Sequence, residues 1–185
     1  ENLAWLIENC YKRKMILQLH FGTFRNVNAK MYEACGKDSG FDIMRGAIDT
    51  DKLAKILDRE NARLGGLPKI VAYPLNDYDL RALGALTGAF PQVKLGAAWW
   101  FNDTANGIKR QLETAAEYSA LGTQYGMLTD SRSFSSYVRF DFYRRILSSF
   151  IGERVGNGEY DEAAAIALAR KIAYANIILK KGVIK

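Results

Sequence analysis

The stretch KIVAYPLNDYDLRALGALTGAF, residues 69–90, decides the fold. Its first part, residues 69–75, is a short apolar run without polar alternation, which is typical of a parallel strand covered on both faces. Its second part, residues 77–90, places Leu80, Leu83 and Leu86 at helical spacing. A buried strand followed directly by an amphipathic helix is one unit of an α/β fold, in which strands and helices alternate.

The same pattern repeats on both sides of this stretch. Three further apolar runs predict strands at residues 15–21, 93–101 and 125–129. Amphipathic segments predict helices at residues 49–64, 104–121, 135–155 and 161–181, with another at the start of the chain and a long loop after the first strand. This order predicts a parallel sheet of four strands, either as an open sheet or as half of a (β/α)8 barrel.

Composition places the chain among soluble globular proteins. Its 185 residues suit one domain, and no apolar stretch resembles a membrane span or a signal peptide, so we expect a soluble, cytoplasmic protein. The net charge of +6 is scattered along the chain, and nucleic acid and membrane are therefore not expected as partners. Cys10 and Cys35 have no metal-ligand spacing and are expected to be reduced thiols. The chain opens at Glu1 inside a helical pattern, which suggests a fragment.

Polar and aromatic residues gather where the predicted strands end. They are His20, Arg25, Asn26 and Asn28 after the first strand, Asn76 and Asp77 after the second, Trp99, Trp100, Asn102 and Asp103 after the third, and Asp130, Ser131 and Arg132 after the fourth. Such side chains suit a polar, anionic ligand, and all would lie on one rim of a barrel. Asn76, Asp77 and Asp103 could equally cap the helices that follow them. Adjacent strand residues face opposite sides, so at most one of Trp99 and Trp100 is expected to line a pocket.

The alternation of side chains along a strand also predicts where the only histidine lies. Gln18 and His20 share one face of their strand, as Leu128 and Asp130 share one face of theirs. If both faces point into a barrel, His20 and Asp130 approach the same volume. An imidazole and a carboxylate there suit a divalent metal or proton transfer, although a single histidine is more often a hydrogen-bonded structural residue.

Three motifs resemble a known family. LHFGTFRNVNAK (19–30), AAWWFNDTANGIKRQL (97–112) and GMLTDSRSFSSYVRFDFYRRIL (126–147) together resemble the C-terminal half of the uronate isomerases, also called glucuronate isomerases, of the amidohydrolase superfamily. The resemblance implies a distorted (β/α)8 TIM barrel of which residues 1–185 form the C-terminal half, strands five to eight and a C-terminal helix, with the N-terminal half absent. It implies an aldose-ketose isomerase that interconverts D-glucuronate with D-fructuronate and D-galacturonate with D-tagaturonate.

The resemblance also assigns roles to individual residues. It implies that Asp130 is a catalytic group and metal ligand, and that Arg132 is a catalytic residue that holds the substrate. His20 would be a metal ligand or a substrate contact, and the remaining substrate contacts would be Arg25, Asn26, Trp99 and Trp100. The implied cofactor is a divalent metal, zinc, whose other ligands lie in the missing N-terminal half. The implied partners are a hexuronate, that N-terminal half and further copies in a homo-oligomer.

Two departures and two alternatives remain open. Val27 interrupts the family's RNNN run, and Phe140 and Asp141 stand where the family has RHEY, so the role of that helix start is in doubt. A metal-dependent hydrolase of the same superfamily is one alternative, ranked lower because residues 73–76 lack a histidine. The other is a non-catalytic module that binds a sugar acid. It predicts that the chain folds alone and does not convert its ligand.

Overall fold

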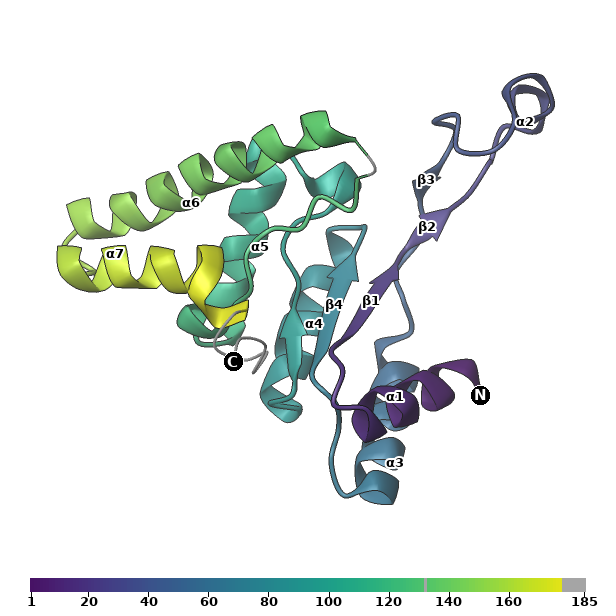
Figure 1. Ribbon diagram of the computed structural model, residues 1–185, viewed down its shortest axis with the longest axis horizontal. Helices are drawn as coiled ribbons and strands as arrows, with labels where there is room; N and C mark the ends of the chain where they lie inside the picture. Colours follow the sequence, from purple (N-terminus) through teal and green to yellow (C-terminus); the bar gives the residue numbers. More distant parts are fainter. Residues whose placement is uncertain (132, 178–185) are drawn as a thin grey trace.

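The centre of the molecule is a parallel sheet of three strands. The computed structural model describes residues 1–131 and 133–177 (Figure 1). Strands β1 (Leu17–Phe21), β4 (Ile70–Pro74) and β5 (Val93–Leu95) pair in the order β1-β4-β5, with Leu17 opposite Ile70 and Ile70 opposite Val93. All five residues of β4 are buried, as its continuous apolar sequence predicts for a central strand.

Helices follow the strands close to their predicted bounds. They are α1 (Asn2–Lys12), α3 (Thr50–Leu64), α4 (Tyr78–Ala89), α5 (Ala105–Tyr118), α6 (Val138–Gly156) and α7 (Glu162–Arg170), which continues as a π-helix over Lys171–Ala175. Local signals set these bounds: Asp49 caps α3 by accepting from the Lys52 amide, and Gly65 ends it in the left-handed conformation. Among the described helices, none is both long enough and apolar enough to cross a bilayer.

Residues 22–48, expected as a long loop, form an arm with its own short elements. Strands β2 (Thr23–Phe24) and β3 (Ile43–Met44) pair antiparallel, and α2 (Ala29–Cys35) lies between them. Figure 1 shows this arm projecting away from the other elements. Its return to the sheet is fixed by the loop after β4: Asn76 Nδ2 donates to the Arg45 carbonyl at 3.0 Å, and Asp79 Oδ1 accepts from the Ile48 amide at 3.0 Å.

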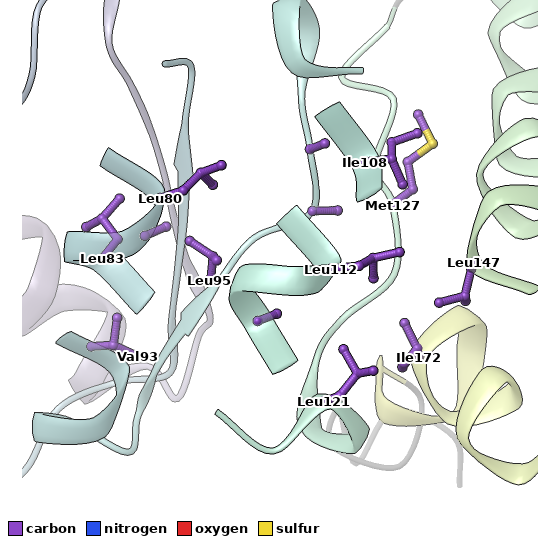
Figure 2. Close-up of a cluster of buried hydrophobic side chains, with 14 of the residues drawn as sticks. Leu80, Leu83, Val93, Leu95, Ile108, Leu112, Leu121, Met127, Leu147 and Ile172 are labelled. Atoms are coloured by element: carbon purple, nitrogen blue, oxygen red, sulfur yellow. The ribbon is translucent and has the colours of Figure 1, made fainter. Parts of the chain in front are cut away.

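The two faces of the sheet belong to different apolar clusters. Ile70 and Ala72 of β4 join the large cluster built from the helices, part of which Figure 2 shows, with Leu80 and Leu83 of α4 beside Leu95. The alternate residues of β4 face the other way, because side chains alternate along a strand. The second, smaller cluster contains Val71, Tyr73, Leu75, Trp99 and Tyr125. The helices therefore cover one face, and aromatic side chains cover the other.

The expectation of a fourth strand at residues 125–129 is wrong. In the described part of the chain this segment has no regular secondary structure and belongs to no sheet, so the parallel sheet has three strands rather than four. The carbonyls of Gly122 and Gln124 accept instead from Nδ2 of Asn176, at 2.9 and 2.8 Å. Gly126 also lies so close to the C-terminal helix that a Cβ atom there would be 2.8 Å from the Ile172 carbonyl oxygen. The segment packs against that helix in place of strand pairing.

Candidate functional site

An open pocket of about 1250 Å³ lies at the ends of the strands. Its lining comes from β1, the arm, residues 99–100, residues 127–131, the start of α6 and the C-terminal helix. These segments are far apart in the sequence, and the carboxyl ends of parallel strands bring them together. Of the residues expected on one rim, those that line this pocket are His20, Arg25, Trp99, Trp100, Asp130 and Ser131.

His20 and Asp130 meet in this pocket. His20 Nδ1 lies 3.8 Å from Asp130 Oδ2, so the approach that side-chain alternation predicts is confirmed. The imidazole is held between two aromatic rings: it stacks on Tyr73 at 4.6 Å between ring centres and meets the edge of Trp99 at 4.5 Å. Nδ1 is buried and has no hydrogen-bond partner among the described residues. The arrangement leaves a nitrogen lone pair or N–H facing a carboxylate.

The environment of His20 favours its neutral form. Burial lowers the pKa of His20 below its ordinary value of 6.5, and the nearby Asp130 carboxylate opposes this shift only in part. A neutral imidazole can accept at one nitrogen and donate at the other, or ligate a metal, whereas an imidazolium can only donate. At neutral pH the His20 imidazole is therefore neutral. Its partner, the Asp130 side chain, is more than half exposed to solvent.

The backbone is left-handed at four residues of this region. Asn26, Asp38, Trp100 and Asp130 have φ values of +53°, +60°, +50° and +47°. Such conformations are uncommon for residues other than glycine and gather at functional sites. At Trp100 the turn opens a short 3-10 helix (Trp100–Asn102), whereas Trp99 is still extended, so strand alternation does not continue from Trp99 to Trp100. For this reason both Trp99 and Trp100 line the pocket, and the expectation that only one does is wrong.

Arg25 reaches the pocket from the arm. Its guanidinium lies 4.7 Å from the ring centre of Trp100, in a cation–π contact, and Trp100 stacks in turn on Phe101. Arg25 Nη1 also pairs with Asp42 at 2.8 Å and with Asp38 at 3.8 Å. Arg25 therefore lines the pocket, and carboxylates of the arm balance its positive charge.

Asn26 stands apart from the described pocket lining. The backbone amide of Asn26 donates to Asp42 Oδ1 at 2.8 Å, and Asn26 is not among the lining residues, so its contact with substrate stays a prediction. Arg132 lies outside the described residues. Its expected role also stays a prediction.

The alternative roles of the polar residues after β4 and β5 are now resolved. Asn76 Oδ1 accepts from the Asp79 amide at the start of α4, and Asp77 pairs with Arg110 at 2.8 Å. The cap of α5 is Thr104, which accepts from the Gly107 amide. The Asp103 side chain is buried next to Thr104 and forms an ion pair with a residue of the third motif, residues 126–147.

That residue is Arg139, which sequence reasoning missed as a pocket residue. Arg139 extends from α6 to form an ion pair with Asp103, and its Nη1 also donates to the Thr129 carbonyl at 3.3 Å. Arg139 and Phe140 both line the pocket, while a role in function for this helix start stays open. The only signal in the sequence was the position of both residues in the third motif.

The described residues of the pocket do not supply a complete set of metal ligands. Within residues 1–131 and 133–177, no group of three or more His, Cys, Asp and Glu side chains is arranged to hold a metal ion. His20 and Asp130 nevertheless provide one imidazole and one carboxylate, which are two of the ligand types that zinc accepts. The tryptophans provide flat apolar faces, against which the C–H groups of a sugar can pack.

The comparisons with known proteins all identify the same family. A family model described as glucuronate isomerase matches residues 1–178. The uronate isomerase of Staphylococcus haemolyticus is 44% identical over 181 residues, which cover 90% of this chain and 38% of that protein. The uronate isomerase of Caldanaerobacter subterraneus is 44% identical over 150 residues, 78% of this chain and 32% of that protein.

Solved structures agree with these sequence matches. The chain superposes on the glucuronate isomerase of Caulobacter crescentus with a TM-score of 0.89 at 28% identity, covering 100% of this chain and 39% of that one. For the uronate isomerase of Thermotoga maritima the TM-score is 0.86 at 30% identity, covering 97% and 39%. The chain therefore spans 32–39% of the length of these relatives.

Proposed function

Because this chain belongs to the glucuronate isomerase family, we propose that it supplies part of the active site of an enzyme that interconverts D-glucuronate with D-fructuronate and D-galacturonate with D-tagaturonate. One observation carries this function beyond family membership. His20 and Asp130, from segments far apart in the sequence, lie 3.8 Å apart in an open pocket at the strand ends. That is where barrel enzymes place their reacting groups.

The finer fold follows from the same premise. We propose that residues 1–185 are the C-terminal half of a (β/α)8 barrel and that the other half completes the pocket. Two observations support this arrangement: the helices cover one face of the sheet only, and the aromatic cluster of Val71, Tyr73, Leu75, Trp99 and Tyr125 lies on the other face. In a complete barrel that second face is the interior, which layers of side chains fill.

Asp130 is the group we assign to proton transfer. Its carboxylate takes the proton from C2 of the aldose as O1 gains a proton from solvent, which gives an enediol. The proton held by the carboxylate then passes to C1 as O2 loses its proton to solvent, which gives the ketose. Neutral His20 holds a sugar hydroxyl beside Asp130, and Trp99 and Trp100 form the apolar wall. Arg132 is assigned to the substrate carboxylate, which an arginine can bind through two parallel hydrogen bonds.

A divalent metal, zinc, fits the donor set. His20 Nδ1 is buried without a hydrogen-bond partner among the described residues and faces the Asp130 carboxylate. We propose that these two side chains hold the metal with ligands from the rest of the protein. When bound, it would supply positive charge that stabilises negative charge developing as the enediol forms.

The test replaces Asp130 by Asn in the full-length protein. We expect wild type to form ketose from D-glucuronate or D-galacturonate, and Asp130→Asn to lose at least about 100-fold in kcat, as for other general acid–base groups. The matched control is Asp141→Asn, since the Asp141 side chain is 54% exposed and that of Asp130 is 55% exposed. It should keep wild-type activity.

Two outcomes would contradict this function. Turnover by Asp130→Asn within a fewfold of wild type would remove Asp130 from the chemistry. Cleavage of a lactone or amide panel by wild type, without any conversion of uronates, would favour the metal-dependent hydrolase.

A further inference from the structure

Arg139 joins two segments of the pocket rim. From the first turn of α6 its guanidinium pairs with the Asp103 carboxylate and donates from Nη1 to the Thr129 carbonyl at 3.3 Å. The Asp103 side chain is only 2% exposed, while that of Arg139 is 33% exposed. Because a buried carboxylate is costly without a cationic partner, Asp103 fixes where the guanidinium lies.

The Thr129 carbonyl is the acceptor directly before Asp130. Asp130 is left-handed, with φ at +47°, and a residue other than glycine keeps such a conformation only when its surroundings hold it. The hydrogen bond from Arg139 holds the peptide on one side of Asp130. On the other side, the Ser131 amide donates to Thr129 Oγ1 at 3.4 Å, and Ser131 Oγ accepts from the Ser133 amide at 3.2 Å.

Asp103 belongs to the aromatic side of the pocket. Its amide donates to the Trp100 carbonyl at 3.0 Å, which closes the turn that begins at the left-handed Trp100. The ion pair therefore ties this turn to the peptide at Thr129. Since Asp103 balances the charge of Arg139, the guanidinium is not a free receptor for a substrate anion.

We propose that Arg139 and Asp103 form a clamp that positions the Asp130 carboxylate relative to the aromatic wall during isomerisation. Arg139 is a positioning residue, which acts through the backbone at residues 129–130 rather than by contact with the reacting atoms. The inference rests on the proposed function, because the position of Asp130 matters for turnover only if Asp130 handles the proton.

The test uses the full-length protein with Arg139→Gln, Asp103→Asn and the double variant. Each single variant should lose about 10- to 100-fold in kcat while KM stays within about threefold, as for other residues that orient a reacting group. Arg139→Gln should also lower the unfolding midpoint, since Asp103 is left buried and unpaired. In the double variant the midpoint should recover, because no buried charge remains, while kcat stays low.

Two further measurements separate positioning from packing. Glu153→Gln, which removes the Lys109–Glu153 contact between α5 and α6 at 3.5 Å, is the control and should leave kcat within about twofold. Arg139→Lys keeps the charge but cannot bind both acceptors through a planar fork, so it should restore the midpoint more than kcat. Amide hydrogen exchange at residues 129–131 should be faster in Arg139→Gln and Asp103→Asn, but not in Glu153→Gln.

Three results would overturn the clamp. One is wild-type kcat in both single variants, and another is recovery of kcat together with the midpoint in the double variant. The third is a raised KM at unchanged kcat, which would make Arg139 a substrate contact. If wild type itself converts no uronate, the proposed function fails. The clamp is then judged by hydrogen exchange alone, and unchanged exchange at residues 129–131 overturns it as well.

Discussion

The ring of Tyr73 occupies the space where Gly96 would carry a side chain. A Cβ atom on Gly96 would lie 2.2 Å from Tyr73 Cδ1 and 2.4 Å from Cε1, far inside contact distance. The same ring stacks on His20. The absence of a side chain at residue 96 therefore leaves room for the ring on which the His20 imidazole stacks.

Gly96→Ala should disturb both stability and turnover. The methyl group must displace Tyr73, and overpacking of this kind costs about 1–3 kcal/mol. Since Tyr73 supports His20, kcat should fall as well. The measurements are denaturant unfolding and uronate turnover of the full-length protein.

Gly152→Ala is the matched control for that change. Gly152 lies inside α6, and a Cβ atom there would meet nothing within 4 Å. Alanine should stabilise the helix by about 0.5–1 kcal/mol and leave kcat unchanged. Equal effects of the two substitutions would show that Tyr73 moves aside freely and does not position His20.

An ion cluster between α1 and α3 should make stability depend on pH. Arg63 Nη2 pairs with Glu8 at 2.8 Å and with Glu60, whose side chain is only 3% exposed. Hydrogen bonds from Lys12 and Arg63 lower the pKa of Glu8 below 4.5, and a hydrogen bond from Arg63 does the same for Glu60. A lowered pKa in the folded state contributes stability that is present above the unfolded value and lost as the pH falls through the folded value.

Arg63→Met should therefore be less stable than wild type at pH 7, and the difference should shrink as the pH falls below 4.5. Unfolding midpoints of both proteins between pH 7 and pH 3 measure this. Arg81→Met is the control, because Arg81 and Glu117 form an exposed pair that should contribute little at any pH. A constant difference across the range would mean that the carboxylates of Glu8 and Glu60 are not responsible.

The sequence predicts features whose causes lie within a few residues. The start and end of α3 follow from Asp49 and Gly65, which act on backbone groups of their own helix. The meeting of His20 with Asp130 was predicted from alternation along two strands, but only His20 lies in a strand, so for Asp130 the prediction was right for a reason that the structure does not bear out. These rules need no knowledge of distant contacts.

The features that the sequence did not predict depend on distant partners. Residues 125–129 have the apolar pattern of a strand, but Asn176, about fifty residues later, binds the carbonyls just before them. The pairing of Asp103 with Arg139 likewise joins two motifs that have no common local pattern. A contact between distant segments leaves no periodic trace, so only the assembled structure reveals it.

The arm should open locally when Asp42 loses its charge. Asp42 accepts from Arg25 Nη1 and from the Asn26 amide, both at 2.8 Å. Hydrogen bonds to charged groups contribute about 1.5–3 kcal/mol, so Asp42→Asn should speed amide exchange across residues 22–48 by at least about tenfold. The unfolding midpoint of the whole protein should change little, since the arm projects from the body (Figure 1).

Asp38→Asn is the control for the arm. Asp38 faces the same Arg25 Nη1 atom, but at 3.8 Å and with a side chain that is largely exposed. Its loss should leave exchange in the arm nearly unchanged. If Asp38→Asn and Asp42→Asn have the same effect, the two hydrogen bonds of Asp42 do not hold the arm.

The attachment of the C-terminal helix should depend on the amide of Asn176. Its Nδ2 donates to the carbonyls of Gly122 and Gln124, and the residue is buried. Asn176→Asp removes both donors and places a carboxylate against two carbonyl oxygens, so the protein should lose about 1–3 kcal/mol, measured by denaturant unfolding. The same change at Asn157, which donates to Glu159 at an exposed turn, should cost much less.

The same substitution should also affect residues 125–129, which directly follow the carbonyls that Asn176 binds. Asn176→Asp should make that segment more susceptible to proteolysis. Protection equal to that of wild type would mean that packing of Gly126 against Ile172 alone holds the segment.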